Sequence, residues 1–119
     1  MTATYTKILV LILLFLGEAL SIYAEMVGAR NNNLANQQFW QIFWKMFLII
    51  TLAGGLLIAG YMLGFSVFKN IWIISVASIT SILIVEPILI WIFFQQVPTK
   101  GAVVGFILGA IGLFSAIFF

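Results

Sequence analysis

Four long apolar segments constrain this chain more than any other feature. Each is close to the length of about 20 residues that a helix needs to cross the hydrocarbon core of a bilayer. We therefore predict an all-α fold, an integral membrane four-helix bundle in one domain, with both termini on the same side. The predicted helices are 5–27, 39–64, 71–94 and 101–118. The composition agrees, because 65% of the 119 residues are hydrophobic and only 7% are charged.

Composition also excludes several classes of site. The sequence contains no cysteine and no histidine, which excludes disulfides, Cys/His zinc sites and Ser–His or Cys–His nucleophiles. The acidic residues are Glu18, Glu25 and Glu86, so we expect no enzyme activity, no metal site and no cofactor. A net charge of +2 is too small to indicate a nucleic-acid partner.

The N-terminal segment has some features of a signal peptide, because Lys7 precedes an apolar run. A cleavage after Ala24 would place Ile22 where a small residue is needed. The apolar run also continues to membrane length. We therefore interpret the segment as a retained first helix.

The third apolar segment carries Glu86 and Pro87 near its middle. An ionised carboxylate in hydrocarbon is costly, and Pro87 removes a backbone hydrogen bond and should kink the helix. We interpret the pair as part of an ion or substrate site, and the alternative is a protonated or paired glutamate used for packing. Ser75 shares the face of Glu86, and Ser78 lies toward its edge. These hydroxyls can donate to a bound group or to carbonyls of their own helix.

Glu18, Ser21 and Glu25 are spaced by three and then four residues, so they form one polar stripe on the first helix. Glu18 lies inside the hydrocarbon, whereas Glu25 lies near the exit, where it can reach headgroups. Lys45 lies about two turns into the second helix, and we expect it at a depth comparable with Glu18 and Glu86. It can pair with one of the two glutamates, or its side chain can extend back to the interface.

The longest polar run, residues 28–38, predicts a surface loop. Four aromatic residues follow it at once: Phe39, Trp40, Phe43 and Trp44. Such residues at a helix entrance usually mark the headgroup level of the membrane. The alternative is a site where ring faces attract a cation.

Two glycine patterns predict close helix contacts. Gly60 and Gly64 form a GxxxG spacing in the second helix, and Gly101, Gly105 and Gly109 recur every four residues in the fourth. Small residues at such spacings let another helix approach the backbone closely. The pattern does not say whether that helix belongs to the same chain.

The segment EPILIWIFFQQVPTKGAVVGFILGAIGLF, residues 86–114, resembles the end of a drug/metabolite transporter repeat. The shared pattern is Glu-Pro within a helix, a short loop with a Pro-Thr-like start to the last helix, and repeated glycines in that helix. The length, the four helices and a glutamate in the first helix resemble the small multidrug resistance branch and half-length EamA-like proteins. This resemblance implies an antiparallel homodimer that exchanges protons for cationic substrates at Glu18.

Two classes of function remain open. The first is a small secondary transporter, coupled to protons or another cation and working as a dimer on a small cationic or amphipathic substrate. Its candidate binding residues are Glu18, Glu86, Lys45 and Ser78. The alternative is a structural or accessory subunit of a larger membrane complex, or one half of a heteromeric lipid-carrier flippase. In either case we expect the lipid bilayer of a prokaryotic cytoplasmic membrane as the surroundings.

Overall fold

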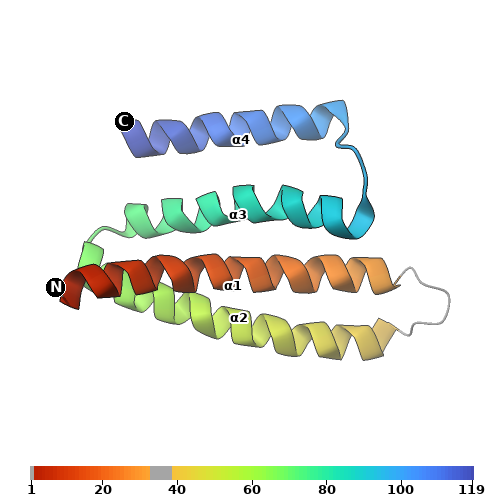
Figure 1. Ribbon diagram of the computed structural model, residues 1–119, viewed down its shortest axis with the longest axis horizontal. Coiled ribbons are helices and arrows are strands. Elements are labelled where there is room, and N and C mark those ends of the chain that lie inside the picture. The colour runs from red at the N-terminus through yellow and green to blue at the C-terminus, as the bar shows by residue number, and fades with distance from the viewer. Residues whose placement is uncertain (1, 33–38) are drawn as a thin grey trace.

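The computed structural model describes residues 2–32 and 39–119, which form four helices and no strand (Figure 1). The helices are α1 (Thr2–Asn32), α2 (Phe39–Phe68), α3 (Ile71–Phe94) and α4 (Lys100–Phe118). Each is long and apolar enough to cross a bilayer. The length and composition of the four helices therefore confirm the prediction of an all-α integral membrane protein with four helices able to span the membrane.

Two helices run past the ends expected from the sequence. α1 continues to Asn32, so the first part of the predicted 28–38 loop is helical, and the rest of that loop lies outside the described residues. α2 continues to Phe68, four residues beyond its predicted end at residue 64. Packing explains the second extension, because Val67 and Phe68 lie against the buried core. Tertiary contacts of this kind routinely override local sequence signals at helix ends.

The two turns joining α2 to α3 and α3 to α4 are fixed by backbone conformation and side-chain caps. Lys69 and Gln95 adopt left-handed backbone angles, with φ of 57° and 52°, directly after α2 and α3. The side chain of Asn70 accepts a hydrogen bond from the backbone N–H of Trp72 at 3.0 Å and so caps α3. Thr99 caps α4 in the same way. Short turns of this kind place consecutive helices side by side.

The core lies between the N-terminal half of α1, the C-terminal half of α2 and the start of α3. Val10, Leu14 and Ile74 are fully buried there. Partly buried side chains surround them: Leu57, Tyr61, Val67, Phe68 and Ala77.

Gly60 and Gly64 of α2 are buried and make the close approach of the first three helices possible. A Cβ atom at Gly60 would lie 2.9 Å from Leu14 of α1, and one at Gly64 would lie 3.0 Å from Ile74 of α3. Both glycines therefore pack inside this chain, at contacts where a side chain would force a neighbour to move.

α4 is the outlier of the fold. Its backbone approaches α3 and neither of the other two helices (Figure 1). A Cβ atom at Gly101 or Gly105 would meet nothing within 4 Å, and one at Gly109 would only touch Leu83 at 3.6 Å. The glycine face of α4 has no close helix partner among the described residues, so its predicted role in helix packing stays a prediction about a partner outside this chain.

Candidate functional site

A hydrogen bond between Glu18 and Ser78 joins α1 to α3. The Ser78 hydroxyl donates to Glu18 Oε1 at 3.1 Å. Ser78 is buried, with 4% of its surface exposed, and Glu18 is half-buried. Two other hydroxyls of α3, those of Thr80 and Ser81, donate to carbonyls four residues earlier in their own helix. Ser78 is thus the serine of α3 whose hydroxyl reaches a carboxylate on another helix.

The helical period explains why Ser78 faces α1. The buried residues of α3 are Ile74, Ser78, Ser81 and Val85, a spacing of four, three and four. Residues at this spacing share one face of a helix. Ser78 and Ser81 therefore belong to the buried face of α3, next to side chains that pack on α1, whereas Ser75 is only partly buried.

Gly17, beside Glu18, brings α1 against α2 and was not singled out from the sequence. A Cβ atom at Gly17 would lie 2.7 Å from Cγ of Leu57 and 3.2 Å from the carbonyl oxygen of Ala53. Gly17 and Ala53 are both buried. The available signal was a single glycine in an apolar helix directly before an acidic residue, because small residues mark close helix contacts in membranes.

Glu86 does not meet Glu18 within the described chain. It directly follows the buried residue Val85, so its side chain is turned by about 100° from the face that packs on α1. It also lies eight residues beyond Ser78, about 12 Å farther along α3 at about 1.5 Å per residue. The expected common depth of the two carboxylates is not observed, because that estimate ended the first helix at residue 27, whereas α1 continues to Asn32.

Neither Lys45 nor Pro87 takes part in the hydrogen bond between Glu18 and Ser78. Lys45 is exposed on α2 and forms no ion pair with Glu18 or Glu86 among the described residues. Pro87 lies inside α3, which continues as a helix on both sides of it. The predicted kink at Pro87 stays a prediction.

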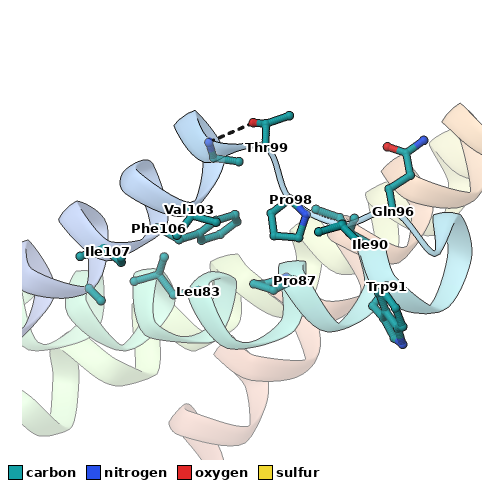
Figure 2. Close-up of a pocket in the computed structure, with 13 residues that line it drawn as sticks. Leu83, Pro87, Ile90, Trp91, Gln96, Pro98, Thr99, Val103, Phe106 and Ile107 are labelled. Carbon is teal, nitrogen blue, oxygen red and sulfur yellow. Dashed lines mark hydrogen bonds between the residues drawn. The ribbon is translucent and has the colours of Figure 1, made fainter.

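A groove of about 650 Å³ lies between α3, the 95–99 turn and α4, and Figure 2 gives its labelled lining. Pro87 and Pro98 both line it, and Gln96 and Thr99 are the polar residues among otherwise apolar or aromatic side chains. The Thr99 side chain is held by its bond to the backbone N–H of Ala102 (Figure 2). A second groove, between α1 and α2, contains Glu25.

No family model, curated protein or solved structure matches the chain. The interpretation of the site therefore depends on its own chemistry. Glu18 is a carboxylate within an apolar helix, with a hydroxyl donor supplied by the facing helix. A carboxylate of this kind can hold a proton or accept a cation, and a costly acidic group inside a membrane is a functional-site hypothesis by default.

Proposed function

We propose that the chain is a small secondary transporter in which Glu18 binds a proton or another cation in exchange for substrate. The observation that carries this proposal is the hydrogen bond from the buried Ser78 hydroxyl to Glu18. An ionised carboxylate has about four acceptor positions on its two oxygens. Because Ser78 uses one of them, Glu18 stays held between α1 and α3 while the others remain open to a proton or a cation.

The proposal includes a dimer. Four helices of this length enclose little volume, and α4 packs against α3 alone. A second copy meeting the open Gly101, Gly105 and Gly109 face of α4 would enclose more volume and place a second helix against bare backbone. In such a dimer Glu86 is a second candidate for proton binding. The antiparallel run of successive helices in Figure 1 supports both termini on one side of the membrane.

The remaining terms of the proposal come from the sequence resemblance to drug/metabolite transporters. They are a small cationic or amphipathic substrate and a prokaryotic cytoplasmic membrane. The resemblance at residues 86–114 supports them, together with a carboxylate in the first spanning helix.

A second candidate is an accessory subunit, or one half of a heteromeric lipid-carrier flippase. The open glycine face of α4 supports a partner chain of either kind. The groove of about 650 Å³ between α3 and α4 favours the flippase, because its apolar lining suits a hydrocarbon chain.

Transport in proteoliposomes tests the first proposal. Purified protein is reconstituted with an imposed pH gradient, and uptake of a panel of radiolabelled organic cations is measured. We expect Glu18→Gln to abolish proton-coupled uptake. Ser81→Ala is the matched control, because its hydroxyl bonds to its own helix, and it should retain uptake.

Unchanged uptake in the Glu18→Gln variant would remove the mechanism. Purification in mild detergent separates the two candidate functions. A homodimer supports the transporter, whereas a stoichiometric unrelated partner supports the subunit.

A further inference from the structure

A groove of about 310 Å³ lies between the C-terminal part of α1 and the N-terminal part of α2. α2 diverges from α1 toward this end of the molecule (Figure 1). The glycines of α1 agree: a Cβ atom at Gly17 would collide with α2, whereas one at Gly28 would make an ordinary contact with Met46 at 3.5 Å. The groove is therefore a consequence of how the two helices separate.

One wall of the groove is a ladder of phenylalanine rings. Phe39, Phe43 and Phe47 line it and recur every four residues, so they share one face of α2. Neighbouring ring centroids are 5.8 and 5.9 Å apart, with interplanar angles of 20° and 22°. Trp40 and Trp44 pack edge-on against these rings, at centroid distances of 5.2 to 5.6 Å. The tryptophans do not line the groove and instead support the ladder from the side.

The opposite wall contains a carboxylate. Glu25 of α1 lines the same groove, is exposed, and forms no hydrogen bond or ion pair among the described residues. The nearby cation Lys45 is exposed and is not part of the lining. The groove thus combines one negative charge with several aromatic rings, and both attract a cation.

We propose that this groove binds an organic ammonium cation, with the ammonium group at Glu25 and its apolar substituent against the phenylalanine ladder. A bare divalent metal is a poor match, because calcium and magnesium require several oxygen ligands. The described residues contain no group of three or more side chains suited to holding a metal. An ammonium ion with an apolar substituent fits both the size of the groove and its chemistry.

Glu18 does not line the groove, although the charges of Glu25 and Glu18 interact. Glu25 lies seven residues after Glu18, about 10 Å farther along α1 at about 1.5 Å per residue. The proposal therefore goes beyond the transport function, and binding at equilibrium tests it without any transport step. A headgroup-level aromatic belt is the alternative use of these rings, and such a belt would not select a soluble cation.

The test is calorimetric titration of the purified full chain in dodecyl maltoside, an uncharged detergent. The ligand is benzyltrimethylammonium, and its neutral isostere neopentylbenzene serves as the control for shape. We expect the cation to bind at least tenfold more tightly than the isostere. Glu25→Gln should weaken cation binding about tenfold, and Phe43→Leu about three- to tenfold.

Control variants distinguish a local effect from damage to the fold. Phe65→Leu makes the same exchange at the other end of α2, on an exposed residue, and should leave binding unchanged. Phe39→Leu is the second ladder variant, in case Phe43→Leu is not monodisperse. A weakened cation affinity in either ladder variant, without a change in Phe65→Leu, supports the groove.

Several results would overturn the proposal. Equal affinity for the cation and the isostere, or an unchanged affinity in Glu25→Gln, would mean that the ligand enters the groove only through its apolar surface. Loss of binding in Glu18→Gln alone would move the cation to the Glu18 site and leave the proposed function intact. In nanodiscs with a constant share of phosphatidylglycerol, and therefore a constant surface charge, a tenfold difference in affinity between phosphatidylcholine and phosphatidylethanolamine would assign the groove to a lipid headgroup instead of a free cation.

Discussion

Replacing Gly17 with alanine tests the contact between α1 and α2 beside the candidate carboxylate. The matched control is Gly55→Ala, because a Cβ atom at Gly55 would meet nothing within 4 Å. Both glycines lie inside apolar helices. Comparing the two variants therefore isolates the cost of packing from the general effect of adding a methyl group to a helix.

The structure sets the expected size of the difference. Alanine is favoured over glycine inside a helix by about 1 kcal/mol, and both replacements share this gain. At Gly17 the new methyl would lie 2.7 Å from Cγ of Leu57, with the backbone oxygen of Ala53 close behind at 3.2 Å. Forcing an extra methyl into a packed contact costs about 1–3 kcal/mol. We expect Gly17→Ala to be less stable than Gly55→Ala by that amount.

The assay is an SDS titration in mixed micelles with dodecyl maltoside. Helices of a membrane protein keep their backbone hydrogen bonds when they separate, so tryptophan fluorescence is a better signal than helix content. The double variant Gly17→Ala/Leu57→Ala should recover part of the loss, because removing the Leu57 side chain makes room for the new methyl. Equal free energies of unfolding for Gly17→Ala and Gly55→Ala, or strict additivity in the double variant, would refute the contact.

Three further predictions use the same titration or a crosslinking assay. Ser78→Ala should lower the free energy of unfolding by about 1 kcal/mol more than Ser81→Ala, because it removes the donor to Glu18; equal losses would contradict this. Asn70→Ala removes the cap of α3 and should cost about 1 kcal/mol; no change would mean that water replaces the cap. Gly105→Leu should keep the unfolding midpoint of the monomer but lower the dimer fraction after crosslinking, whereas an unchanged dimer fraction would place that face against lipid.

The number and type of helices could be predicted from the sequence, because each apolar segment independently reaches membrane length. The ends were less predictable. Residues 28–32 are polar enough to resemble a loop, yet they continue α1. Phe68 lies beyond the predicted end of the second helix but packs on the core. Boundaries of this kind depend on contacts with other helices, which no local pattern contains.

Both residues of the site could be predicted from the sequence, but the hydrogen bond between them could not. Glu18 and Ser78 were both candidates, but Ser78 was grouped with Glu86 of its own helix. The structure instead directs Ser78 toward α1, with Ile74 and Val85, and turns Glu86 away from that face. Choosing between these arrangements requires the rotation of α3 about its own axis. In an almost wholly apolar helix the hydrophobic pattern barely defines that rotation.

The two glycine patterns lie in different surroundings, because their spacing does not determine which helix packs against them. Gly60 and Gly64 resemble the glycines of α4 in spacing, yet only the former pair is enclosed by this chain. The spacing indicates that a close approach is possible, and it does not identify the approaching helix. The identity of the partner depends on assembly, because α4 lies beside α3 alone.

The glycine contacts and the Glu25 groove lie at opposite ends of the bundle. Lipid tails are as apolar as leucine, so close helix contacts in a membrane depend on small residues and not on hydrophobic burial. The close contacts at Gly60 and Gly64 fall in the half that contains Val10 and Ile74. Glu25 lines the groove between the C-terminal part of α1 and the N-terminal part of α2. Because a charged group needs polar partners or water, the groove is a place where a carboxylate can stay accessible, while the contacts of Gly60 and Gly64 hold the helices together at the other end.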